Sequence, residues 1–140
     1  MSVQFFFLSK SISLSKRREL KSFIEFIFKN EKRSVTSLTY IFCSDDYLLK
    51  INQDFLNHNY YTDIITFDMS DTKETIKGEI YISLERVQEN AKNIGVSGIH
   101  ELHRVIFHGV LHLCGYKDKI NLEINEMRSK EDFYLDLFFK

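Results

Sequence analysis

The segment His108–Asp118, which reads HGVLHLCGYKD, constrains the fold of this chain more than any other part of the sequence. His108 and His112 are four residues apart, so on a helix their Cβ atoms lie on one face, about 5–6 Å apart. Gly115 follows and can adopt the positive φ that ends a helix and turns the chain back. The segment therefore predicts a helix, a bend and a site where His108, His112 and Asp118 bind one zinc ion, with a fourth position open for water.

Two histidines at this spacing occur often by chance, and a single histidine on an apolar helix face is usually a hydrogen-bonded core residue. Gly115 and Asp118 change the balance, because with the histidines they reproduce the HxxxHxxGxx(H/D) spacing of metzincin-type zinc sites. The sequence therefore favours metal binding. Gly109 stands where HExxH peptidases carry the glutamate that acts as general base, so a peptidase interpretation lacks its base.

Length and composition predict one domain that spans residues 1–140. The 140 residues are 44% hydrophobic, enough to bury a core without disulfides or a structural metal. The fold does not require zinc for stability, so the predicted zinc can have a catalytic role. Cys43 and Cys114 form no CxxC pattern, which fits a reducing cytosol. The N-terminal apolar run lacks the features of a secretory signal, and no run approaches the ~18 apolar residues of a membrane span. We therefore expect a soluble, cytoplasmic protein without a membrane anchor.

Hydrophobic periodicity predicts an α+β fold, a small mixed β-sheet of about four strands covered by helices. Strands are expected at Val3–Leu8, Ser37–Cys43, Ile64–Met69 and Glu79–Ser83, the last two as a hairpin. Helices are expected over residues 15–29, 45–56, 84–94, 98–114 and 121–138, with N-caps at Ser44, Ser83 and Ser97 and a stop at Gly95. Inward positions include Phe55 on the second helix and Ile124, Met127 and Tyr134 on the last. The histidine pair then lies on a buried central helix.

Charge is uneven along the chain, although the formal net charge is −1. Residues 1–33 hold eight basic and three acidic residues, so the remainder is acidic. Clustered basic side chains can bind the phosphates of a polyanion, and Arg17, Arg18 and Lys21 of the first helix are candidates. A solvated helix face explains the same pattern, and charge alone favours that interpretation.

Three separated motifs occur in the chain in the order TDIITF (Thr62–Phe67), GEIYIS (Gly78–Ser83) and HGVLHLCGYKD. They resemble the TDVLSF, GDIxIS and HGxLHLxGYDH motifs of the YbeY-type rRNA maturation factors, bacterial metal-dependent, single-strand-specific endoribonucleases. The resemblance implies zinc-dependent cleavage of RNA phosphodiester bonds in rRNA 3′-end maturation and ribosome quality control, with RNA and ribosomal subunits as partners. It also implies that His108, His112 and Asp118 take the three zinc positions.

Two departures from the family pattern concern mechanism. Asp118 stands where the family has its third histidine, and a carboxylate lowers the formal charge of the site, which is expected to weaken the metal as a Lewis acid. Leu56 stands where the family usually has an arginine thought to contact RNA phosphate, so that role is vacant or carried by another residue. His58, Lys117 and Lys119 are candidates by their proximity to the motifs.

The expected mechanism has zinc polarising a phosphoryl oxygen, lowering the pKa of a bound water, or both. The sequence identifies no general base beyond that water. His58 is a candidate because it lies in a predicted loop, where functional groups are often placed. Cys114 and His103 are expected on helix faces remote from the zinc pair. Two alternatives stay open: a ribosome-associated factor that keeps zinc for stability alone, and a metallopeptidase.

Overall fold

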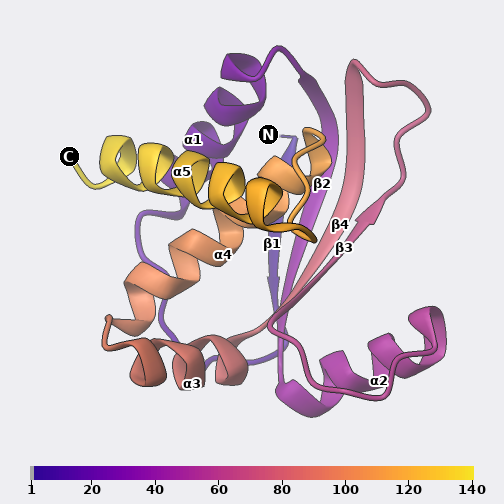
Figure 1. Cartoon of the computed structure of the whole chain (residues 1–140), viewed down its shortest axis with the longest axis vertical. Helices are drawn as coiled ribbons and strands as arrows, with labels where there is room; N and C mark the ends of the chain where they lie inside the picture. Colours follow the sequence, from indigo (N-terminus) through magenta and orange to yellow (C-terminus); the bar gives the residue numbers. More distant parts are fainter. Residues whose placement is uncertain (1) are drawn as a thin grey trace.

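The computed structural model describes residues 2–140 and, within them, a four-stranded mixed β-sheet (Figure 1). The strands are β1 (Val3–Phe7), β2 (Ser34–Cys43), β3 (Ile64–Asp68) and β4 (Thr75–Ser83), in the order β1-β2-β4-β3. β1 pairs with β2 and β2 with β4 in parallel, whereas β3 and β4 form the predicted antiparallel hairpin. The predicted α+β class and mixed sheet are confirmed.

Five helices accompany the sheet in the described part of the chain: α1 (Arg17–Asn30), α2 (Asp45–Leu56), α3 (Leu84–Ile94), α4 (Gly98–Leu113) and α5 (Asn121–Phe138). Ser44, Ser83 and Ser97 are the N-caps of α2, α3 and α4, because each side chain accepts a hydrogen bond from the backbone N–H three residues later. Gly95 ends α3 with a φ of 78°. Among the described helices, none combines the length and the apolar character needed to cross a membrane.

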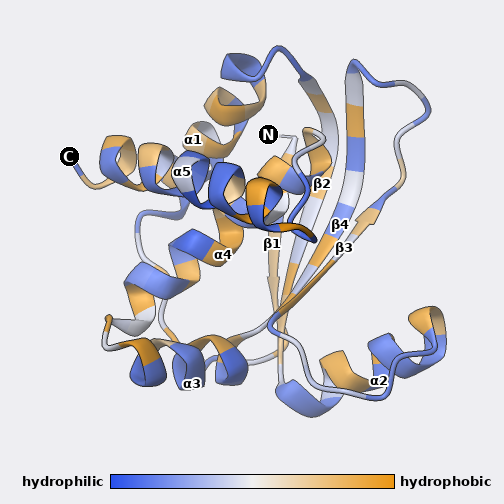
Figure 2. Cartoon of the chain, in the orientation of Figure 1, coloured by the Kyte–Doolittle hydropathy of each residue, from blue (hydrophilic) through white to orange (hydrophobic). Residues whose placement is uncertain are grey.

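The two faces of the sheet carry separate apolar clusters. Successive side chains of a strand point to opposite faces, so Ile80 and Ile82 of β4 lie on one face and Tyr81 on the other. The first face joins the large core with α1 and α4, and the second joins a small cluster that includes Leu48 of α2. Figure 2 shows apolar and polar stretches alternating along the helices, as expected of helices with one buried face. Helix α4, which carries the histidine pair, lies in the large core as predicted.

Two apolar residues predicted to face inward are exposed instead. Phe55, near the end of α2, is 68% exposed, and Ile124 of α5 is 42% exposed. Phe55 lies in the last turn of α2, beyond the part of the helix that is buried at Leu48 and Asn52. The side-chain amide of Asn52 donates to the backbone oxygen of Tyr60 and so ties the loop after the helix to α2. Ile124 borders a small cavity beside His108 rather than the core. Hydrophobic periodicity identifies neither situation.

Strands β2 and β4 both begin earlier than predicted. Ser34 pairs with Thr75 and Val35 with Ile76, so the parallel pairing of β2 with β4 begins at these residues and lengthens both strands at their N-terminal ends. The added residues include Gly78, a poor strand former that the sequence pattern assigned to the turn. Pairing between strands outweighs local propensity here because it satisfies the backbone hydrogen-bonding groups of both strands.

Candidate metal centre

Helix α4 approaches the sheet closely, and this sets the position of its histidines. A Cβ on Gly109 would lie 2.7 Å from Cδ1 of Ile80 and 3.2 Å from Cδ1 of Ile64. The absence of a side chain at Gly109 allows this packing. On the neighbouring side of the helix, His108 and His112 line a cavity bounded by residues of β3 and α5.

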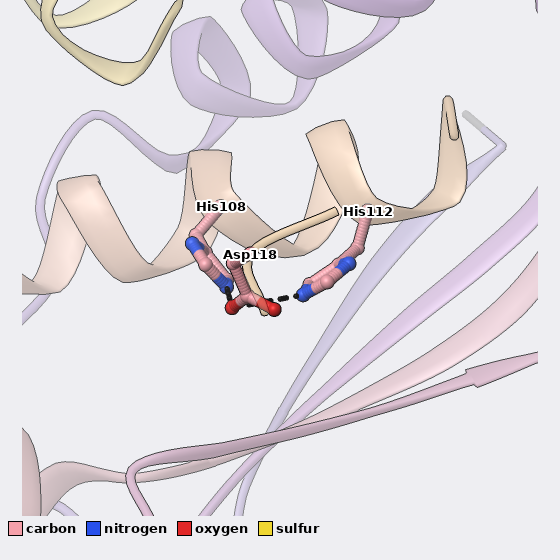
Figure 3. A group of neighbouring side chains, drawn as sticks. All are labelled: His108, His112 and Asp118. Carbon is pink, nitrogen blue, oxygen red and sulfur yellow. Dashed lines mark ion pairs between the residues drawn. The ribbon is translucent and has the colours of Figure 1, made fainter. Parts of the chain in front are cut away.

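The side chains of His108, His112 and Asp118 meet at one place (Figure 3). Oδ2 of Asp118 lies 3.2 Å from Nε2 of His108 and 3.3 Å from Nε2 of His112. The two imidazole rings are nearly perpendicular, at 84°, with centroids 4.7 Å apart. One ligand atom from each residue lies within 4.8 Å of the other two. The fold therefore brings together the three residues that the sequence singled out.

The turn after α4 carries Asp118 back to the histidines. Gly115 has a φ of 104°, in the left-handed region, and its N–H donates to the carbonyl of His112 at 3.0 Å. The N–H of Tyr116 donates to a carbonyl of α4, and its hydroxyl donates to Glu31 at 2.8 Å. These bonds tie the loop to α4 and to the end of α1, so the loop itself holds Asp118 near the histidines.

Glu131 of α5 holds the other nitrogen of His108. Nδ1 of His108 lies 2.6 Å from Oε2 of Glu131, while Nε2 faces Asp118. Oε1 of Glu131 accepts a hydrogen bond from Nη1 of Arg104 at 2.8 Å. Burial opposes the charged form of His108, but the hydrogen bond and charge of Glu131, together with Asp118 and Asp63, raise the pKa of His108. A carboxylate on the second ring nitrogen is the usual way of orienting a metal-binding histidine.

A cavity of about 520 Å³ opens beside the three side chains. Its wall includes Asp63, from the turn before β3, and Glu101 of α4. Burial raises the pKa of both carboxyls, so they hold a proton at higher pH than exposed carboxyls do. Oε1 of Glu101 is buried and has no hydrogen-bond partner among the described residues. Two carboxyl groups that can carry a proton therefore line the same cavity as the three possible metal ligands.

The donor set and its spacing fit a zinc ion. Imidazole nitrogen and carboxylate oxygen are ordinary zinc ligands, at about 2.0–2.2 Å from the metal. Ligand atoms on a tetrahedron with such bonds are about 3.3 Å apart. The oxygen of Asp118 lies 3.2 and 3.3 Å from the two imidazole nitrogens. The cluster could therefore hold a metal ion, with three protein ligands as in catalytic zinc sites.

Comparisons with known proteins identify the family. The model of the family described as Endoribonuclease YbeY matches residues 7–138 of this chain. The chain belongs to the endoribonuclease YbeY family. It is 50% identical over 136 residues to the endoribonuclease YbeY of Cytophaga hutchinsonii, covering 97% of this chain and 95% of that protein. It is 52% identical over 124 residues to the endoribonuclease YbeY of Flavobacterium psychrophilum, covering 86% and 88%.

A solved structure has the same fold. The solution structure of TM1509 from Thermotoga maritima matches with a TM-score of 0.72 at 30% identity, covering 98% of this chain and 89% of that one. The YbeY resemblance that the three motifs indicated is thus confirmed at the level of family and fold.

The residues considered as substitutes for the usual YbeY arginine lie outside the cavity wall. Among the described residues that line it, Leu56, His58, Lys117 and Lys119 are absent. His58 is exposed, with its ring stacked on Tyr60 and its Nδ1 2.9 Å from the Tyr60 hydroxyl oxygen. A catalytic role for His58 stays a prediction.

Other predicted positions fall into two groups. Cys114 and His103 are buried, 7% and 4% exposed, and neither lines the cavity beside the histidine pair, in agreement with the remote helix faces predicted for them. Arg17 and Lys21 of α1 lie over aromatic rings of β1, 4.2 Å and 5.1 Å from the ring centroids. Arg17 and Lys21 therefore help to pack α1 against β1. Binding of phosphate by this helix stays a prediction.

Glu131 is one of the site residues that sequence reasoning missed. It follows Met127 by four residues and precedes Tyr134 by three, and all three are buried, so Glu131 lies on the inward stripe of α5. A carboxylate on such a stripe must be paired when it is buried, which is the signal the sequence does contain. Its partners, His108 and Arg104, belong to another helix and are identified only by the fold.

Proposed function

We propose that this chain is a zinc-dependent, single-strand-specific endoribonuclease that acts in rRNA 3′-end maturation and ribosome quality control. The observation that carries the proposal is the cluster of His108, His112 and Asp118 beside an open cavity, in a member of the YbeY family. The names of the family and of the curated relatives support RNA as the substrate. The set of two nitrogen donors and one oxygen donor supports zinc as the metal.

In this proposal His108, His112 and Asp118 hold one zinc ion. When bound, zinc supplies Lewis-acid stabilisation of a phosphoryl oxygen and a lowered pKa of a coordinated water. Glu131 orients His108, because its bond to Nδ1 fixes the ring with Nε2 toward the site. The remaining side of the cluster faces the cavity, where a substrate strand can enter.

Asp63 and Glu101 are the proposed proton carriers of the cavity. A carboxyl whose pKa is raised toward neutrality is a better general acid or base than an ordinary one, and burial raises the pKa of both groups. The ends of the cleaved RNA identify the attacking group. A 2′,3′-cyclic phosphate indicates attack by the ribose 2′-hydroxyl, whereas hydrolytic ends indicate attack by water.

We propose that residues 1–140 form one cytoplasmic domain that works on ribosomal subunits and the 3′ regions of rRNA. The near-complete coverage of both this chain and its Cytophaga hutchinsonii relative supports a single functional unit. A factor that binds ribosomes and keeps zinc only for stability is the alternative that the following experiment separates from a nuclease.

Removal of zinc by a chelator is expected to lower cleavage of a labelled single-stranded RNA by more than about 10²-fold, because the metal supplies most of the charge stabilisation at the phosphate. Added Zn²⁺ is expected to restore it, and metal analysis is expected to give one zinc per chain. The same RNA annealed to its complement is the control and is expected to resist cleavage. Activity that survives chelation contradicts zinc dependence. A zinc-loaded protein that never cleaves RNA supports the alternative, a ribosome-binding factor that keeps zinc only for stability.

Replacement of Glu131 by glutamine is expected to weaken zinc affinity about 10- to 100-fold, because His108 loses the carboxylate that orients its ring. Competition with a chromophoric chelator measures the affinity. Asp132→Asn is the matched control: Asp132 neighbours Glu131 and also binds Arg104, at 2.6 Å, but its side chain is 55% exposed and is absent from the cavity wall within the described chain. Equal zinc affinities of the two variants would exclude a specific role for Glu131.

A further inference from the structure

The cavity beside the cluster is acidic, which is a poor environment for a phosphodiester. Its wall contains five carboxyl groups and only two arginines, Arg104 and Arg128; the carboxyls are those of Asp63, Asp68, Glu101, Asp118 and Glu131. The substrate carries a negative charge at every linkage, and this charge grows as an oxygen attacks phosphorus. A cation besides the metal is therefore needed to hold the strand against these carboxylates.

Arg104 is already committed to protein partners. Its Nη1 donates to Glu131 at 2.8 Å and its Nη2 donates to Asp132 at 2.6 Å. Its side chain is 14% exposed. The guanidinium thus neutralises a buried carboxylate that in turn holds His108, and a phosphate could reach it only by breaking that arrangement.

Arg128 has a free guanidinium at the same cavity. Its side chain is 58% exposed, and its one ion-pair contact among the described residues is a long one, 3.9 Å from Nη1 to Oε1 of Glu131. It also lines the adjoining cavity of about 160 Å³, whose wall includes His108 and Asp118. Arg128 therefore lies beside the proposed metal ligands with its hydrogen-bond donors available.

We propose that Arg128 binds the phosphate of the RNA strand beside the metal centre, an assignment that rests on the RNA-cleaving function proposed above. The guanidinium presents two parallel donors that match two phosphate oxygens, which a lysine does not reproduce. Leu56 cannot supply this contact, because it is a 40% exposed apolar side chain at the end of α2 and is absent from the cavity wall in the described chain. In this assignment the phosphate-binding cation lies on α5.

Binding of a labelled single-stranded RNA to metal-free protein tests the assignment without cleavage. Arg128→Ala is expected to bind about tenfold more weakly, as for loss of a hydrogen bond to a charged group. The slope of log affinity against log salt is expected to fall by about 0.7, the value for one lost phosphate contact on a single strand. Arg128→Lys is expected to keep the slope and recover only part of the affinity. Lys92→Ala, an exposed cation on α3 away from the cavity, is the control and is expected to match the wild type.

Cleavage and zinc content complete the test. With zinc bound, Arg128→Ala is expected to lower kcat/KM at least about tenfold while its zinc content stays that of the wild type. An unchanged salt slope in Arg128→Ala overturns the assignment, even if the wild type cleaves RNA. A reduced slope in Arg128→Ala, together with a wild type that never cleaves RNA, keeps the assignment and contradicts the nuclease. Loss of zinc with unchanged RNA binding overturns the assignment by giving Arg128 a structural role.

Discussion

Replacement of His112 by alanine is expected to remove zinc and to lower RNA cleavage by more than about 10³-fold, which corresponds to a loss of about 4 kcal/mol of transition-state stabilisation. Of the two histidines, His112 can be removed with less disturbance of the fold, because its side chain is 32% exposed and its ionic contact is to Asp118 at 3.3 Å. His108 also binds the buried Glu131, so its loss would disturb folding as well. Metal analysis and cleavage of single-stranded RNA measure the two effects.

Asp118→His is the matched control for His112→Ala, because it exchanges one zinc donor for another where His112→Ala deletes one. The side chain of Asp118 is 37% exposed in the loop, which leaves room for an imidazole. We expect Asp118→His to keep zinc and activity, and to make the metal a stronger Lewis acid, since a neutral ligand replaces a charged one. Full zinc content and full cleavage in His112→Ala would contradict the proposed site.

Replacement of Gly109 by glutamate, which creates the HExxH sequence of zinc peptidases, is expected to destabilise the fold by more than about 4 kcal/mol and to create no peptidase. A Cβ at this position already meets Ile80 at 2.7 Å and Ile64 at 3.2 Å, and a carboxylate there would be buried against apolar side chains. The melting temperature is expected to fall by about 10–20 °C. Thermal unfolding and a casein assay with zinc measure the outcomes.

Gly98→Ala controls for the general effect of replacing a glycine in α4. A Cβ on Gly98 would meet only Cδ1 of Ile12, at 3.8 Å, an ordinary contact. Stability is expected to stay the same or to rise by up to about 1 kcal/mol, because alanine favours a helix. A Gly109→Glu protein that melts like Gly98→Ala would show that α4 does not pack on the sheet as described. Gly109 thus explains the missing peptidase base in physical terms: this position faces strands rather than the metal site.

The secondary structure was largely predictable, because local chemistry determines it. Ser44, Ser83 and Ser97 cap helices where the sequence placed them. The apolar stripe of α1 is buried at Leu20, Ile24, Ile27 and Phe28. The prediction was wrong at Phe55, which is exposed in the last turn of α2, and it did not identify Asn52, which is buried on this helix and donates to a loop backbone. A hydrogen bond between a helix and a loop leaves no trace in hydrophobic periodicity.

The candidate site was predictable only in part, for a similar reason. His108, His112 and Asp118 lie within one short segment, so helix geometry and one glycine bend suffice to bring them together. Glu131 and Arg128 come from a helix that follows later in the chain. Their distance from His108 depends on how α5 packs on α4, which no local pattern specifies.

The amino-acid sequence by itself determined the elements, their caps, the zinc-capable segment and the YbeY resemblance, because each of these depends on residues that are close together along the chain. The tertiary structure alone decided which carboxylate orients His108, which arginine is free to meet a phosphate, and why Gly109 must lack a side chain. The first two features arise where α4, α5 and β3 meet around one cavity, and the third arises where α4 packs on β3 and β4. Contacts of that kind are set by the packing of whole elements, and packing is a property of the complete fold.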